Sequence, residues 1–200
     1  MSQSREALLG EIATEIESFT ESPLYEYRVE HHYHPVSGEG DPHAEIMFVG
    51  EAPGENEAKS GRPFVGASGR LLDALLTEIG LERQKVYITN IVKDRPPKNR
   101  SPRVGEIRLY FPFLVRQIAI IQPRVIATLG RFAMEAMLKH FDAPEKTKKI
   151  SELHGSRIDV QASYGNVSIV PLYHPAVALY TNERKPELVA DFQILKAFID

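Results

Sequence analysis

The chain has 200 residues, of which 42% are hydrophobic and 26% are charged, and its net charge at pH 7 is −3. This length suffices for one domain with a sizeable core, and no apolar run approaches the length that a membrane span needs. The charge argues against a histone-like protein that binds nucleic acid in bulk, and the absence of cysteine excludes disulfides and cysteine-ligated iron–sulfur clusters.

The first predicted element is a surface helix over residues 2–19, whose apolar residues recur on one face. The segment is amphipathic and acidic and lacks the apolar core of a secretion signal, so we expect a cytoplasmic protein. Residues 20–43 show no period and are rich in Pro, Gly and His, which predicts a long irregular segment.

Strands and helices alternate through the rest of the chain. Strands are expected at 44–50, 86–92, 125–129 and 167–172, with a strand or extended segment at 153–161. Helices are expected at 68–80, about 104–121, from Gly130 onward and at 186–199, with a turn or short helix after His174. This alternation predicts a single α/β domain over residues 1–200, with a mostly parallel sheet and the amino-terminal helix packed on it.

Ligands of such sheets bind beyond the carboxyl ends of the strands, where three segments should converge. The first, GEAPGENE at 50–57, is neither a Walker A loop nor a dinucleotide-binding loop. Its three carboxylates, Glu51, Glu55 and Glu57, would repel phosphate. They suit the activation of water or the stabilisation of a developing positive charge.

Three further residues have side chains suited to a planar base. Phe64, in a turn rich in proline and glycine, is either a stacking platform or a plug of the core. Asn90 ends a predicted strand, and its carboxamide complements the edge of uracil, although such residues are more often turn or cap residues. His174 follows the last strand and could stabilise a departing anion, or serve only a structural role.

A basic loop follows the second predicted strand. Five cations lie within eleven residues and alternate with prolines: Lys93, Arg95, Lys98, Arg100 and Arg103. Such a loop either contacts phosphates or is a solvated surface loop. The histidines His31, His32, His34 and His43 fit no compact metal motif, so we expect no metal site.

Together, the segments GEAPGENE, SGRPFVGASG, VYITNIVKDRPPKNRSP and YHPAVAL resemble the family 4 uracil-DNA glycosylases, in the same order and with similar spacing. The likeness runs from about residue 20 to the carboxyl terminus. It implies a three-layer α/β/α sandwich around a short parallel sheet. It also implies a DNA repair enzyme that flips uracil out of DNA and excises it by hydrolysis without a cofactor, leaving an abasic site.

The resemblance implies roles for the acidic segment. Glu51 matches the residue that positions or activates water. Ala52 occupies the place of a catalytic aspartate in other glycosylase families, so the neighbouring acid would act instead. Glu57 matches a residue that walls the pocket near uracil C5 and discourages thymine.

It also implies roles for the later segments. Phe64 matches the stacking aromatic, Asn90 the base-recognising amide and His174 the histidine that faces the leaving anion. Lys93, Arg95, Lys98 and Arg100 would contact DNA. So would the loop that enters the minor groove, with its residues Ala176, Leu179 and Tyr180. Tyr180 stands where an arginine is common, which would weaken phosphate contact or change the wedge.

One departure concerns the iron–sulfur cluster that family 4 enzymes hold on four cysteines. The matching positions here are Phe19, Ser22, Asp94 and Tyr110, so the cluster must be absent. We expect the bulky Phe19 and Tyr110 to fill the vacated space. The cluster lies away from the chemistry in the family, so activity need not be lost.

Other readings of the resemblance stay open. The same fold could act on hypoxanthine or xanthine, or could bind uracil-containing DNA without catalysis. Covalent trapping of DNA, known in a related branch with a basic loop that ends in histidine, is not expected, because KDRPPKNRSP contains no histidine. Uracil-containing DNA is the expected partner, a membrane is not, and a monomer is the default expectation.

Overall fold

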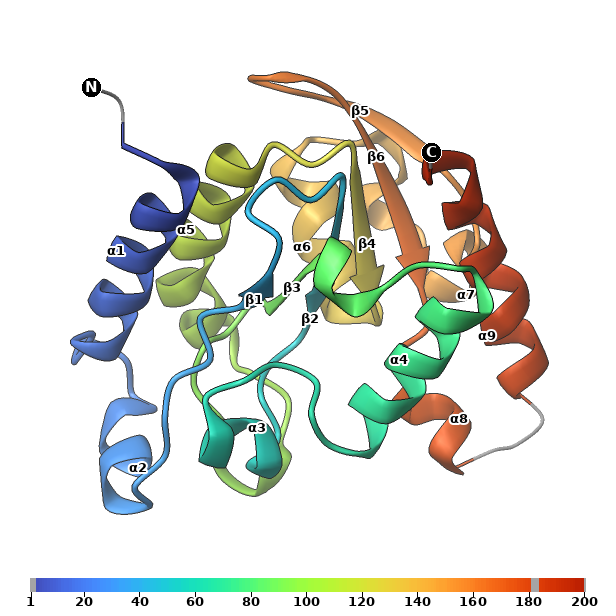
Figure 1. Ribbon diagram of the computed structural model, residues 1–200. Helices are drawn as coiled ribbons and strands as arrows, with labels where there is room; N and C mark the ends of the chain where they lie inside the picture. The colour runs from blue at the N-terminus through green and yellow to red at the C-terminus, as the bar shows by residue number, and fades with distance from the viewer. Residues whose placement is uncertain (1–2, 181–183, 200) are drawn as a thin grey trace.

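The computed structural model describes residues 3–180 and 184–199 (Figure 1). Its centre is a six-stranded sheet in the order β1-β3-β2-β4-β6-β5. The strands are β1 Glu39–Gly40, β2 Ile46–Gly50, β3 Tyr87–Asn90, β4 Val125–Leu129, β5 Ile158–Ala162 and β6 Gly165–Leu172. The inner four strands, β3, β2, β4 and β6, are parallel, and the two edge strands are antiparallel. The mostly parallel sheet predicted from the sequence is confirmed.

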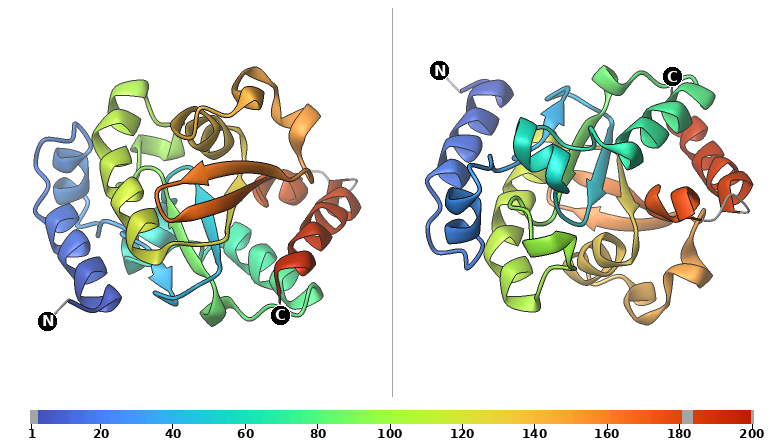
Figure 2. Two further views of the ribbon diagram at one scale, coloured as in Figure 1. Left: turned by 90° about the horizontal axis from the view of Figure 1, so that it is seen from above. Right: turned by 90° about the horizontal axis from the view of Figure 1, so that it is seen from below.

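Helices cover both faces of the sheet (Figure 2). They are α1 Arg5–Glu17, α2 Tyr25–Glu30, α3 Glu55–Ser60, α4 Ala67–Glu78, α5 Val104–Ile121, α6 Arg131–His140, α7 Ile150–Leu153, α8 Ala176–Tyr180 and α9 Lys185–Phe192. Short 3-10 turns occupy Arg83–Lys85, Pro97–Asn99, Pro144–Thr147 and Gln193–Phe198. Among the described helices, none is long and apolar enough to cross a membrane.

The side chains of strand β2 pack into the hydrophobic cores on both faces of the sheet. Met47 and Val49 face the layer that contains α1, α5 and α6, whereas Ile46 and Phe48 face the layer that contains α4 and α9. Successive side chains of a strand point to opposite faces, so a strand covered on both sides needs apolar residues throughout. The expected three-layer sandwich is confirmed.

Three short helices were not predicted. Helix α2 lies within the segment expected to be irregular, α3 begins inside GEAPGENE, and α7 lies just before the segment expected to be extended and shares only Leu153 with it. Each has six residues or fewer, too few to show a helical period in the sequence. The closing helix also differs, because α9 ends at Phe192 and continues as a 3-10 turn.

The amino-terminal helix α1 packs on α5, at the outside of the molecule. Arg5 donates a hydrogen bond to the carbonyl of Ile121 at 3.0 Å, which caps the carboxyl end of α5. At the other end of α1, Arg116 of α5 pairs with Glu15. These contacts fix α1 along α5 and leave the carboxyl ends of the strands open.

Candidate functional site

A cleft of about 550 Å³ lies at the carboxyl ends of the parallel strands. Figure 2, right, views the molecule from this side, with α3 and α8 around the strand ends. The three segments predicted to converge do so here. The residues that line the cleft include Glu51, Ala52, Glu57, Phe64, Asn90, Arg100, His174, Ala176 and Leu179, together with Asn56, Ser68 and Asn99, which the sequence did not single out.

Phe64 forms part of the floor of the cleft and is held in an uncommon backbone conformation. Its φ of 50° lies in the left-handed region, and its side chain is buried. Arg83 donates hydrogen bonds to the carbonyls of Pro63 and Phe64, at 2.6 and 3.2 Å. The ring lies 5.7 Å from the imidazole of His174, with an interplanar angle of 30°. The ring is therefore fixed by its backbone and roughly parallel to the histidine.

Asn90 is 2% exposed, and its Oδ1 atom has no hydrogen-bond partner among the described residues. A buried amide oxygen without a partner costs free energy, so this atom is suited to a donor that a ligand supplies. Gly50 lies beside it in register on β2. A Cβ atom at Gly50 would come within 3.0 Å of both Asn90 Oδ1 and the Phe64 ring. Gly50, which the sequence reading missed, therefore makes room for both.

His174 enters the cleft directly after β6. Burial lowers the pKa of His174 to about 4, so the imidazole is neutral near pH 7, and Glu57 opposes this shift. Its Nδ1 atom accepts a hydrogen bond from the Ala176 amide at 3.1 Å. A neutral imidazole that accepts at Nδ1 carries its proton on Nε2. His174 can therefore donate a hydrogen bond from Nε2 without being charged.

Glu51 follows β2 and is partly buried in the cleft. Burial raises the pKa of Glu51 above its usual value, while a hydrogen bond with Ser101 and the charge of Arg131 oppose this shift. Neither Ser101 nor Arg131 was singled out from the sequence. The carboxylate is thus placed where it can orient water or face a developing positive charge.

Glu57 lines the cleft, where the resemblance implies that it walls the pocket, and it also holds the loop that carries Phe64. Its Oε1 atom accepts hydrogen bonds from the amides of Val65 and Gly66, at 2.9 and 2.7 Å. Glu57 therefore fixes the loop that carries Phe64, from its place on α3. Ala52, the next residue after Glu51, also lines the cleft.

The structure corrects half of the predicted basic surface. Lys93 is fully buried, and Arg95 is 8% exposed, with its nitrogens donating to Asn99, Tyr33 and Glu55. The prediction that Lys93 and Arg95 contact DNA is wrong. The spacing of cations along a loop does not show which of them find oxygen partners when the loop folds back on the protein.

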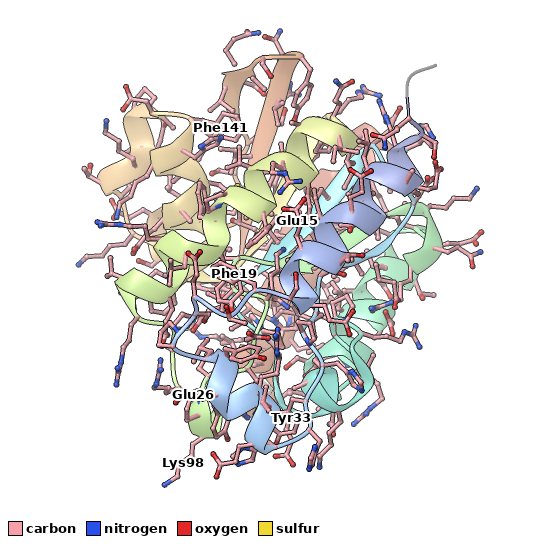
Figure 3. The ribbon with its side chains drawn as sticks, turned by 90° about the vertical axis from the view of Figure 1, so that its left-hand side faces the viewer. Glu15, Phe19, Glu26, Tyr33, Lys98 and Phe141 are labelled. Atoms are coloured by element: carbon pink, nitrogen blue, oxygen red, sulfur yellow. The ribbon has the colours of Figure 1, made fainter. Side chains whose placement is uncertain are left out.

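The other two cations of the loop remain at the surface. Lys98 is exposed and extends from the end of the molecule where Tyr33 lies (Figure 3). Arg100 lines the cleft and pairs with Glu106, whose Oε1 accepts at 2.5 Å. Arg100 therefore lies at the rim of the cleft, and the exposed Lys98 lies two residues before it in the same loop.

Helix α8 forms the opposite rim. Leu179 is 47% exposed and lines the cleft, as does Ala176. An exposed leucine at the mouth of a cleft is an apolar group available to a ligand. The side chain of Tyr180, the third residue predicted to contact DNA here, lies outside the described residues.

The four positions matched to cluster cysteines lie together: Ser22, Asp94 and Tyr110 are buried, and Phe19 is half-buried beside them. Tyr110 donates a hydrogen bond to Asp94 Oδ2 at 2.5 Å, and its ring packs edge-on against Phe19 with centroids 5.5 Å apart. Figure 3 shows the side of the molecule on which Phe19 lies. Ser22 is buried and hydrogen-bonds to Tyr110, which lowers the pKa of the phenol against the larger effect of burial.

Asp94 is also paired with a cation. Arg28 Nη1 donates to both carboxylate oxygens of Asp94, at 3.2 and 3.3 Å. Burial raises the pKa of Asp94, whereas Tyr110 and Arg28 lower it. An aromatic pair and a buried ion pair thus occupy these positions. In the described part of the chain, no group of three or more His, Cys, Asp or Glu side chains could hold a metal ion.

The chain is similar to known proteins over most of its length. The sequence model of the Uracil DNA glycosylase superfamily matches residues 37–195. The chain is 44% identical to a type-4 uracil-DNA glycosylase of Sulfurisphaera tokodaii, over 94% of this chain and 83% of that protein. It is 42% identical to the type-4 enzyme of Archaeoglobus fulgidus, over 92% and 90%. It is 39% identical to that of Thermotoga maritima, over 98% and 97%.

Proposed function

The chain belongs to the uracil-DNA glycosylase superfamily, and we propose that it excises uracil from DNA by hydrolysis of the N-glycosidic bond. One observation carries the proposal. The partnerless Oδ1 of Asn90 lines the same cleft as the ring of Phe64 and the imidazole of His174. An acceptor, an aromatic face and a neutral donor are what a flipped uracil needs.

Base recognition follows from the carboxamide of Asn90. Its Oδ1 accepts the N3–H of uracil, and its Nδ2 donates to O4. Cytosine presents the reverse arrangement at these two positions, so its binding leaves buried polar groups unpaired. Phe64 stacks on the base, and Glu57 closes the side near C5, where thymine carries a methyl group.

The bond between the sugar C1′ and the base N1 breaks with its electron pair leaving on the base. The uracilate anion accepts a hydrogen bond at O2 from Nε2 of His174. The carboxylate of Glu51 stabilises the cationic sugar and orients water, whose oxygen adds to C1′. The proton released from this water passes to solvent through Glu51, and solvent protonates the uracilate. The products are free uracil and an abasic site.

The target nucleotide must leave the helix before it can enter the cleft, which costs a few kcal/mol of unstacking. Arg100 at one rim and the exposed Lys98 of the same loop neutralise phosphates, and Leu179 at the other rim occupies the space that the base leaves. Repair of uracil-containing DNA is thus the role we propose, with no cofactor in the reaction.

The test is a single-turnover assay on an oligonucleotide that contains one uracil, with alkaline cleavage of the product. We expect Asn90→Ala and His174→Ala each to lower the excision rate about 100- to 1000-fold, the usual effect of losing one such hydrogen bond. Asn166→Ala and His43→Ala, outside the cleft, are matched controls that should keep the wild-type rate. Unchanged rates in both cleft variants would refute the assignment.

Matched oligonucleotides with thymine or hypoxanthine separate the other readings. Faster release of hypoxanthine than of uracil would identify a different lesion as the substrate. Tight binding of uracil-containing DNA with no alkali-sensitive product would identify a binding protein without catalysis.

A further inference from the structure

Lys93 is a fully buried lysine three residues after the base-reading Asn90. Its Nζ donates hydrogen bonds to Thr89 Oγ1, the carbonyl of Asn90 and Gln117 Oε1, at 2.7, 2.8 and 2.7 Å. A longer contact of 3.3 Å reaches the carbonyl of Ser37. Neither DNA nor solvent can reach this group, so its function lies inside the protein.

The surrounding groups accept an ammonium and not a neutral amine. Burial lowers the pKa of Lys93 well below its usual value. However, the hydroxyl of Thr89 already donates to the Ser37 carbonyl at 2.8 Å, and Gln117 Nε2 donates to the same carbonyl at 2.7 Å. The lone pair of a neutral amine would therefore face oxygen atoms with no donor to receive. The three protons of an ammonium match the three near acceptors.

The contact with Asn90 places this charge at the end of β3. Beyond Asn90 the chain bends away from the sheet, and Lys93 folds back over that bend to hold the Asn90 carbonyl. The backbone of Lys93 is anchored as well, because its carbonyl accepts from the Val36 amide at 2.8 Å. The bend is therefore closed by a buried, charge-assisted hydrogen bond, a strong form of such contacts.

We infer that Lys93 is a positioning residue whose ammonium group fixes Asn90, so that its carboxamide meets the edge of the base. The inference rests on the proposed function. Lys93 does not touch the substrate and acts through the backbone of Asn90. A misplacement of about 1 Å in a catalytic site can cost about 100-fold in rate, so the effect should appear in the rate of excision and not in the affinity for DNA.

The absence of cysteine makes a sharp experiment possible, since Lys93→Cys introduces a single thiol. Alkylation of the unfolded variant with 2-bromoethylamine followed by refolding restores an ammonium, with sulfur in place of one methylene group. Alkylation with 1-bromopropane gives a neutral side chain of the same length. The exposed Lys139→Cys, treated in the same two ways, is the control for alkylation and refolding.

Single-turnover excision at saturating enzyme then compares two side chains of the same length, one charged and one neutral. We expect the propyl derivative to be about 10- to 100-fold slower than the aminoethyl derivative, with similar affinity for the oligonucleotide. We also expect the side-chain amide NMR signal of Asn90 to shift in the propyl derivative and to return in the aminoethyl derivative. The two Lys139→Cys derivatives should be equally active.

Equal rates and equal Asn90 signals in the two Lys93→Cys derivatives would overturn the inference while the proposed function stands. If the propyl derivative does not refold, the neutral hydroxyethyl derivative from 2-bromoethanol replaces it, with the same expected difference. If the wild-type protein releases no uracil, the proposed function fails and the inference falls with it.

Discussion

Gly50→Ala adds one methyl group at the floor of the cleft. Gly50 ends β2 and pairs in register with Asn90 at the end of β3. A Cβ at this position would lie 2.7 Å from Cζ of Phe64 and closer still to Oδ1 of Asn90. A single methyl group would therefore push on the ring of Phe64 and on the amide of Asn90 together.

The size of the effect follows from these distances. Ordinary contacts of a Cβ begin at 3.4 Å, so the Phe64 ring must retreat by about 0.7 Å and the Asn90 oxygen must move further. Both side chains are buried and both line the cleft, so they can move only by distorting their neighbours or by entering the cleft. Overpacking of this kind costs about 1–3 kcal/mol of stability. A shift of about 1 Å in the reacting geometry costs about 100-fold in rate.

The assay is single-turnover excision of uracil at saturating enzyme, together with urea unfolding. We expect Gly50→Ala to be folded, less stable and about 100-fold slower. Gly10→Ala on α1 is the matched control, because a Cβ there has nothing within 4 Å. It should keep the rate and gain about 0.5–1 kcal/mol of stability, as alanine usually does in a helix. A wild-type rate in Gly50→Ala would refute the description of the cleft floor.

Two further predictions concern charge. The pKa of Glu51 is raised and that of His174 is lowered to about 4, so protonation of Glu51 should lower the excision rate before His174 becomes charged as the pH falls. Glu51→Gln should be slow, with a pH profile that stays flat above the pKa of His174, and its melting temperature at pH 7 should rise, because it no longer buries an ionised carboxylate. Asp94→Ala leaves Arg28 buried without its partner and should cost about 3–5 kcal/mol in urea unfolding. Arg116→Ala, in an exposed pair, should cost less than about 1 kcal/mol.

These two predictions fail on different results. If the excision rate of Glu51→Gln falls with decreasing pH as steeply as that of the wild type, a group other than Glu51 causes the loss of rate at low pH. Equal losses of stability in Asp94→Ala and Arg116→Ala would show that the ion pair of Asp94 is no stronger than a surface pair.

The larger elements were predictable because their signals repeat. Helix α5 begins and ends at the expected residues 104 and 121, and β4 covers the expected 125–129. Asn90 and His174 could be assigned to one cleft because each follows a parallel strand, and parallel strands place their carboxyl ends at one edge. The position in the chain thus carried more information than the residue types alone.

The rest depends on contacts between distant segments. No local pattern shows that Arg83 would hold the carbonyls of Pro63 and Phe64, or that Gly50 would lie between a ring and an amide. Gly50 did stand in a quoted motif, and its place at the end of an apolar strand was a usable signal, since glycine there permits close approach. Arg83 gave no such signal, because surface arginines after a helix are common.

In the loop after Asn90, the charge of a residue does not show whether it lies at the surface. The same loop contains a residue that replaces a cluster ligand. Lys93 and Asp94 are adjacent, both buried, and bonded to different groups: Lys93 to oxygen atoms that support Asn90, and Asp94 to Arg28 and Tyr110. The residue at a matched cysteine position is therefore part of a buried ion pair that ties the loop to α2 and α5. Lys93 and Asp94 both lie within four residues of Asn90. The ion pair that stands where a cluster ligand would be therefore also holds the loop that begins at Asn90, the residue proposed to read the base.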